Sequence, residues 1–175
     1  TCFRPFNWIG PKLDELTSDP EKEGSSRVVT QFISSLIKGE PIRLVDGGLQ
    51  RRCFTYIDDG IECLVKIIEN KDNKFNGEIF NIGNPSNEAT VKELAHKLKD
   101  IFVSHPSTKH YKQHSEIIEV FSKDFYGEGY QDIDFRVPSI RKARSLIGWE
   151  PKVDLDTALR KTLEYYLDTN VKGGC

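Results

Sequence analysis

The sequence contains no methionine, although it has 175 residues. A newly translated chain starts with methionine, so we expect this chain to be a processed product or a fragment. Its first residues, 1–6, alternate as a buried strand does and have no polar lead-in. We therefore expect part of the fold to lie upstream of Thr1.

No excess of either charge is present, since 25 Lys and Arg residues face 27 Asp and Glu residues and the net charge is −2. This balance argues against a nucleic-acid-binding protein, which should be clearly basic. No apolar run is long enough for a membrane-spanning helix or a signal peptide, so we expect no membrane partner. The length suffices for one ordinary domain, and the aromatic content of 10% excludes a disordered chain.

Paired metal-binding cysteines are also lacking. The four cysteines, at positions 2, 53, 63 and 175, contain no CxxC pair, which argues against a zinc ribbon. We expect buried free thiols and hence a reducing, cytoplasmic compartment. The four histidines lie within residues 96–114, mostly in a polar, irregular segment, so we predict a solvated loop there and no metal site.

The sequence has no GxGxxG or GxxGxxG loop for a dinucleotide, no GxxxxGK[ST], no HExxH and no GxSxG. No tyrosine is followed by a lysine four residues later. The chain by itself therefore lacks a recognisable centre for redox chemistry or phosphoryl transfer.

Helical and strand-like patterns alternate along the chain, which predicts an α/β or α+β class. Apolar periodicity predicts helices over 28–37, 61–68, 90–101, 139–148 and 155–167, and strands over 2–6, 42–45, 53–57, 78–82 and 117–121. Ser25 or Ser26, Asp58 or Asp59, and Asp154 or Asp156 are expected helix caps, Gly39 a helix end, and Thr90 with Glu93 a capping box. Residues 122–137 have no helical period and are expected to form one long loop of functional type.

Arginines with polar and aromatic neighbours are concentrated in a few loops, at positions 27, 43, 51, 52 and 136. A guanidinium offers paired donors to carboxylates and phosphates, although any single arginine is more often a solvated surface charge. Arg52 and Arg136 stand out because each lies where a loop meets a regular element. Asn7 follows the first strand, where a polar side chain can reach a ligand, and Tyr130 could stack on a base.

Four segments, 4–11, 46–59, 80–84 and 148–151, together resemble the extended short-chain dehydrogenases/reductases that act on nucleotide sugars. Their order and spacing match over nearly the whole chain. Four others, 24–27, 84–88, 126–132 and 136–139, resemble the UDP-glucuronic acid decarboxylases of the bifunctional polymyxin-resistance type. The plant UDP-apiose/UDP-xylose synthases are similar in the same segments.

The resemblance implies a role for each matching residue. Asn7 and the stretch from Arg43 through Gln50 to Arg52 would hold UDP, with Arg52 on the diphosphate. Tyr130 would also contact the nucleotide. Arg27 would lie in the substrate pocket, and Arg136 matches the family's proposed catalytic proton donor near the sugar carboxylate.

The implied reaction is oxidation of UDP-glucuronic acid, or a related UDP-sugar, at C4 by NAD. The resulting β-keto acid loses CO₂, and the C5 enolate is then protonated. Because the pKa of arginine lies above about 12, stabilisation of charge by Arg136 is a more secure role than direct proton donation.

The departure from the family is the absence of its Rossmann half, which carries the glycine loop and the Tyr-x-x-x-Lys pair. We therefore predict the C-terminal, substrate-binding part of an extended short-chain dehydrogenase fold of the Rossmann type. Residues 1–10 would be the last Rossmann-type strand region, and 11–175 a mixed α/β region that binds the nucleotide sugar. NAD would be bound mainly by the missing half, and the full-length protein would be a homo-oligomer. Alternatives are a UDP-apiose/UDP-xylose synthase, another nucleotide-sugar epimerase or dehydratase, or a non-catalytic UDP-sugar-binding module.

Overall fold

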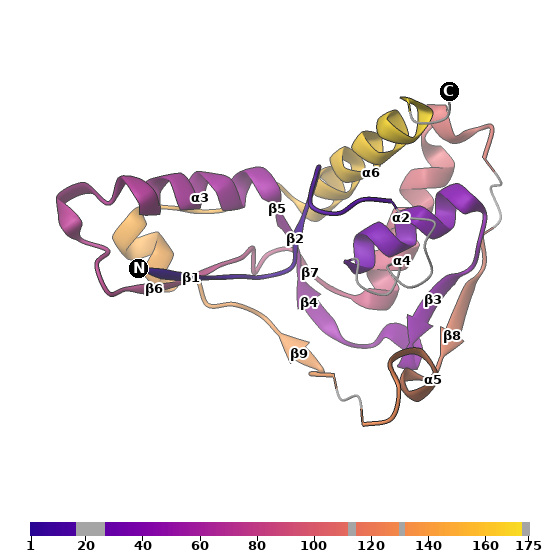
Figure 1. The fold of residues 1–175 in the computed structure, drawn as a ribbon, viewed down its shortest axis with the longest axis horizontal. Coiled ribbons are helices and arrows are strands. Elements are labelled where there is room, and N and C mark those ends of the chain that lie inside the picture. Colours follow the sequence, from indigo (N-terminus) through magenta and orange to yellow (C-terminus); the bar gives the residue numbers. More distant parts are fainter. Residues whose placement is uncertain (17–26, 112–114, 130–131, 173–175) are drawn as a thin grey trace.

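The computed structural model describes residues 1–16, 27–111, 115–129 and 132–172 (Figure 1). The architecture is mixed α/β, and its strands form small separate sheets. The sheets are β1 (Cys2–Pro5) with β6 (Ile79–Ile82), β2 (Trp8–Ile9) with β5 (Thr55–Tyr56), β3 (Ile42–Val45) with β8 (Ile117–Val120), and β4 (Arg51–Cys53) between β7 (Glu88–Thr90) and β9 (Phe135–Arg136). All pairs are parallel except β4 with β7.

Five α-helices and four shorter helical turns connect these strands in the described ranges. They are α2 (Val28–Lys38), α3 (Ile57–Glu69), α4 (Val91–Ser104), α5 (Ser122–Tyr126) and α6 (Leu155–Lys172), the 3₁₀ turns η1 (Asp46–Gly48), η2 (Lys71–Asn73) and η3 (Pro106–Thr108), and the π-helical turn η4 (Ala143–Ile147). The apolar periodicity thus located α2, α4 and α6 correctly. Gly39 ends α2 in the left-handed conformation with φ 69°, as predicted.

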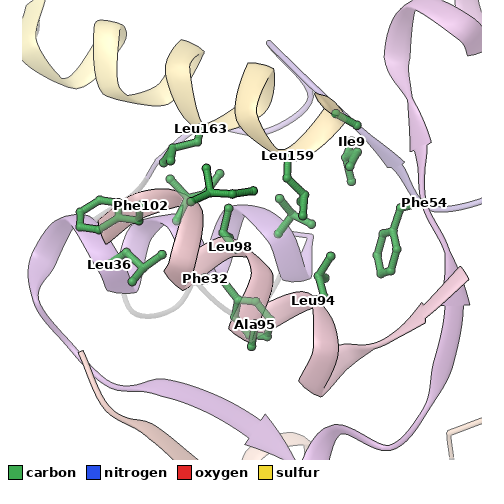
Figure 2. Packing of buried hydrophobic residues seen from close by; sticks show 14 of the residues in the cluster. Ile9, Phe32, Leu36, Phe54, Leu94, Ala95, Leu98, Phe102, Leu159 and Leu163 are labelled. Atoms are coloured by element: carbon green, nitrogen blue, oxygen red, sulfur yellow. The ribbon is translucent and has the colours of Figure 1, made fainter. Parts of the chain in front are cut away.

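The larger hydrophobic core lies where α2, α4 and α6 pack together (Figure 2). Each helix contributes apolar side chains from one face, with Phe32 and Leu36 from α2, Leu94, Leu98 and Phe102 from α4, and Leu159 and Leu163 from α6. All seven side chains are buried. This core includes Ile42 and Leu44 of β3, the strand that carries Arg43, and Phe54, which directly follows β4 and its two arginines.

A second, smaller core lies under α3, between β6 and η4, in the part of the molecule that contains β1 (Figure 1). Its centre is Trp149, which is fully buried and donates its indole N–H to the backbone oxygen of Asp59 at 2.9 Å. The Asp59 carboxylate accepts from the backbone N–H of Val153 at 3.0 Å. Asp59 therefore ties α3 to the segment before α6.

This geometry corrects one predicted cap. The helix α3 begins at Ile57 after Tyr56, so Asp58 and Asp59 lie in its first turn and neither is the N-cap. By contrast, Asp154 caps α6, because its carboxylate accepts from both the backbone N–H and the hydroxyl of Thr157. The expected caps Ser25 and Ser26 lie outside the described residues.

Two further expectations were wrong. The first strand is exposed along all four of its residues, because in the described part of the chain β1 pairs with β6 alone. The segment 122–137 is not one loop, since it contains α5 and the two-residue strand β9. β9 forms because the edge of β4 offers it hydrogen bonds, and a partner so distant in sequence leaves no local pattern.

The capping box at the start of α4 is present as predicted. The Thr90 hydroxyl accepts from the Glu93 backbone at 3.0 Å, and the Glu93 carboxylate accepts from the Thr90 backbone at 2.7 Å. These hydrogen bonds lower the pKa of Glu93.

Thr90→Ala is expected to reduce the free energy of unfolding by about 1 kcal/mol. Because the pKa of Glu93 is lowered in the folded state, its stabilising contribution is present above the pKa of an unfolded glutamate and declines as the pH falls through the lowered value. Urea unfolding at neutral and acidic pH measures both effects. The exposed neighbour Lys92→Ala is the control, and an equal loss in both variants would contradict the role of the box.

Candidate functional site

A cavity of about 510 Å³ lies between the first turn of the chain, the start of α2, and strands β3 and β4. Its polar lining brings together five of the residues predicted to bind substrate, namely Asn7, Arg27, Arg43, Gln50 and Arg52, and adds Gln31 and Asp132. Apolar side chains such as Trp8, Phe32 and Phe54 complete the wall. Three arginines and one aspartate line one concave site, an excess of positively charged side chains that suits a polyanionic ligand.

Asn7 lies at the turn between β1 and β2, in the left-handed region with φ 40°, which asparagine tolerates better than most residues. Its side-chain amide donates to the Cys53 oxygen at 3.0 Å, and its own backbone oxygen accepts from Thr55 at 3.1 Å. Asn7 thus fixes the end of β1 against β4 and β5, at the border of the cavity.

Arg27 immediately precedes α2 and is held by the loop before it. Its guanidinium donates to the Leu13 oxygen at 2.8 Å and forms an ion pair with Asp14 at 2.5 Å. The second oxygen of Asp14 accepts from the Arg27 backbone and from the hydroxyl of Thr30. Asp14 therefore holds the start of α2, a role that the sequence did not predict because 13 residues separate it from Arg27.

Arg51 and Arg52 are adjacent on β4, so their side chains leave opposite faces of the strand. Arg51 pairs with Glu88 on β7 at 2.5 Å, away from the cavity. Arg52 is buried in the cavity wall, where its Nη1 donates to the Arg51 oxygen at 2.9 Å and its Nη2 contacts Asp132 at 2.6 Å. Only Arg52 of the two is placed to meet a bound ligand.

Arg43 and Gln50 flank η1. Arg43 is exposed on β3, and the Gln50 side chain donates to the Val45 oxygen at 3.4 Å. The turn between them places both at the same cavity wall.

Arg136 does not line the cavity. It lies on β9 directly opposite Arg52 in the parallel pairing of β9 with β4, and its side chain is exposed. Tyr130 lies outside the described residues. The structure therefore brings Asn7, Arg43, Gln50 and Arg52 to one cavity but keeps the predicted catalytic arginine on the neighbouring strand.

Neither buried thiols nor metal-binding side chains form a second site in the part of the chain that the structure describes. Cys53 and Cys63 are free and buried, and burial raises their pKa to about 11 and about 12, so neither thiol is reactive. Over the described ranges, no group of three or more His, Cys, Asp or Glu side chains could hold a metal ion. No helix in the same ranges combines the length and the apolarity needed to cross a membrane.

The first part of the chain matches a known protein family. Residues 1–83 match the NAD dependent epimerase/dehydratase family. The cavity residues from Pro5 to Phe54, including Asn7, Arg43 and Arg52, lie inside the epimerase/dehydratase match.

Solved structures extend the likeness over the rest of the chain. The PbgP3 protein from Burkholderia pseudomallei is 42% identical, covers 97% of this chain and has a TM-score of 0.80. The UDP-glucose 4-epimerase of Thermotoga maritima, solved with UDP-glucose, is 27% identical over 96% of this chain, with a TM-score of 0.70. The UDP-glucuronic acid 4-epimerase of Bacillus cereus, solved with UDP-glucuronic acid and NAD, shares the fold at 24% identity, 95% coverage and a TM-score of 0.74.

The chain spans a little under half the length of these proteins, at 47%, 46% and 45% respectively. The predicted fold class, an α/β Rossmann-type short-chain dehydrogenase/reductase fold, is confirmed, and this coverage agrees with a partial domain of it.

Proposed function

We propose that this chain is the UDP-sugar-binding portion of an NAD-dependent UDP-glucuronate decarboxylase. The observation that carries the proposal is the cavity, in which Arg27, Arg43 and Arg52 converge with Asn7 and Gln50. Arg52 and Arg43 bind the diphosphate, since a guanidinium fork matches phosphate oxygens. Tyr130 adds a contact to the nucleotide. Nucleotide sugars are also the ligands named for two of the similar structures.

Arg136 and Arg27 serve the sugar end of the ligand in this proposal. Arg136 is tied to Arg52 through the β4–β9 pairing, so a diphosphate on Arg52 brings the attached sugar toward β9. When a 4-keto sugar acid loses CO₂, the C5–C6 bond breaks and its electron pair forms the C4–C5 enolate, which then takes a proton at C5. A fixed positive charge beside that enolate lowers the barrier.

The chain does not itself fit NAD, because its sequence has neither a glycine-rich dinucleotide loop nor a Tyr-x-x-x-Lys pair. We assign NAD binding and oxidation at C4 to the half of the relatives' length that this chain does not match. The open side of β1 and the outer face of α3 would contact that half. Large apolar side chains are exposed there, at Phe3, Ile61, Val65, Ile68 and Ile79.

The chain alone is therefore expected to produce no NADH from UDP-glucuronate and NAD, as measured by NADH fluorescence. A fusion of this chain with the part of the PbgP3 protein that the chain does not match is expected to act on UDP-glucuronate. It should release CO₂ and yield a UDP-4-keto-pentose or a UDP-pentose, identified by mass spectrometry. NADH formation by the chain alone would contradict the division of roles.

The product of the joined protein also separates the alternatives. A UDP-hexuronate that keeps all its carbon would indicate an epimerase, which the 27% identity to a UDP-glucose 4-epimerase favours as the second candidate. UDP-apiose would indicate a UDP-apiose/UDP-xylose synthase. Submillimolar UDP binding by a joined protein that forms no product would favour a non-catalytic binding module.

We further propose a cytoplasmic location and a homo-oligomeric full-length enzyme. Free buried thiols such as Cys53 and Cys63 suit a reducing compartment.

A further inference from the structure

The ion pair between Arg52 and Asp132 lies inside the cavity wall. Only 10% of the Arg52 side chain and 29% of the Asp132 side chain are exposed, and the two groups are 2.6 Å apart. Both residues line the cavity, although 80 positions separate them in the sequence. A buried guanidinium requires an anionic or polar acceptor, and Asp132 is one such acceptor for Arg52.

The two arms of the Arg52 guanidinium have different partners. Nη1 donates to the backbone oxygen of Arg51, a bond between adjacent residues that does not depend on a ligand. Nη2 donates to Asp132, whose carboxylate is the one acidic group among the described residues that line the cavity. The Nη2 arm is therefore the one that a phosphate oxygen could take over.

We propose that Asp132 is a specificity-determining residue that occupies the place of the ligand's phosphate on Arg52. It orients Arg52 through this ion pair, and a nucleoside diphosphate displaces its carboxylate from Nη2 on binding. This inference rests on the proposed function, since it needs a diphosphate at Arg52. The displaced carboxylate stays near the diphosphate, so like-charge repulsion weakens binding and disfavours ligands too weakly charged to compete.

The backbone around Asp132 allows this exchange without loss of the strand. Arg51 donates its N–H to the Asp134 oxygen at 2.7 Å, and Arg52 pairs with Arg136 in the β4–β9 register. These contacts hold β9 whether or not the Arg52–Asp132 ion pair is made. The exchange therefore requires the Asp132 carboxylate to leave Nη2, and with it the Ile133 N–H that donates to the same oxygen, without a change in the strand pairing.

Asp132→Asn isolates the charge, because the asparagine oxygen can still accept from Arg52 and from the Ile133 backbone, as Asp132 does now. By calorimetry, this variant is expected to bind UDP about three- to tenfold more tightly than the unaltered protein. Affinity for uridine, which has no phosphate, is expected to stay unchanged. Asp134→Asn is the matched control, since it removes an equal charge from an exposed side chain that does not line the cavity.

Each outcome of these binding measurements either supports or overturns the proposed exchange. Tighter UDP binding by Asp132→Asn alone, or binding by this variant where the unaltered protein shows none, supports the exchange. Unchanged or weaker binding overturns it while leaving the proposed function intact, and so does an equal gain in Asp134→Asn. Absence of UDP binding in every variant overturns both the exchange and the proposed function.

Discussion

Arg52→Ala is expected to weaken UDP binding roughly 10- to 100-fold, the cost of losing charge-assisted hydrogen bonds to a phosphate. Arg52 is the buried guanidinium of the cavity, and its position is fixed by the Arg51 oxygen and by Asp132. A side chain held in this way loses little conformational entropy when it binds a ligand, so most of its hydrogen-bond energy contributes to affinity. Calorimetric titration with UDP measures the loss.

The adjacent residue provides the matched control. Arg51→Ala removes the same charge from the same strand, but Arg51 pairs with Glu88 on the opposite face and does not line the cavity. Its UDP affinity should stay within about twofold of the unaltered protein, as expected for a screened charge outside the site. Arg52→Lys should fall between the two, since lysine keeps the charge and loses the fork. Equal losses in Arg51→Ala and Arg52→Ala would contradict the specific role of Arg52.

Trp149→Ala is expected to lower the free energy of unfolding by about 3–5 kcal/mol, the usual cost of truncating a buried aromatic side chain. Trp149 is fully buried at the centre of the smaller core, among Cys63, Phe80 and Ile140. Its indole N–H satisfies the Asp59 oxygen, so the substitution also leaves a buried acceptor without its donor.

Urea unfolding measures this loss. Leu146→Ala is the control, because Leu146 is in the neighbouring turn η4 with about half of its surface exposed and should change stability by less than about 0.5 kcal/mol. Trp149→Phe should lie between the two variants. A loss below about 1 kcal/mol in Trp149→Ala would show that the smaller core does not depend on this side chain.

The parts of the fold that the sequence predicted are those set by local chemistry. The apolar stripes of α2, α4 and α6, the left-handed Gly39 and the capping box of Thr90 and Glu93 each depend on residues within a few positions of one another. Cys53 and Cys63 are buried, as expected for free thiols that pack as small hydrophobic groups. The same expectation was wrong for Cys2, which is exposed on β1, and Cys175 lies outside the described residues.

The parts that could not be predicted depend on partners distant in sequence. Asp59 looked like a cap, but a buried contact with Val153, 94 residues away, determines its role. β9 exists only because β4 lies beside it. No local signal distinguishes Asp132 from its neighbour Asp134, although only Asp132 meets the buried Arg52.

For the candidate site, too, the sequence predicted some features and left others open. The resemblance to a family selected Asn7, Arg27, Arg43, Gln50 and Arg52, and the structure brings these residues to one cavity. Their roles toward UDP stay predictions, as does the catalytic role of Arg136, which lies beside the cavity on an exposed strand.

The most direct test of the proposed UDP site is a crystal structure of the protein with UDP. We predict that the diphosphate lies in the 510 Å³ cavity, with its oxygens within hydrogen-bond distance of the Arg43 and Arg52 guanidinium groups. UDP bound elsewhere on the protein, or no binding at millimolar UDP in solution, would contradict the assignment of this cavity to a nucleotide sugar.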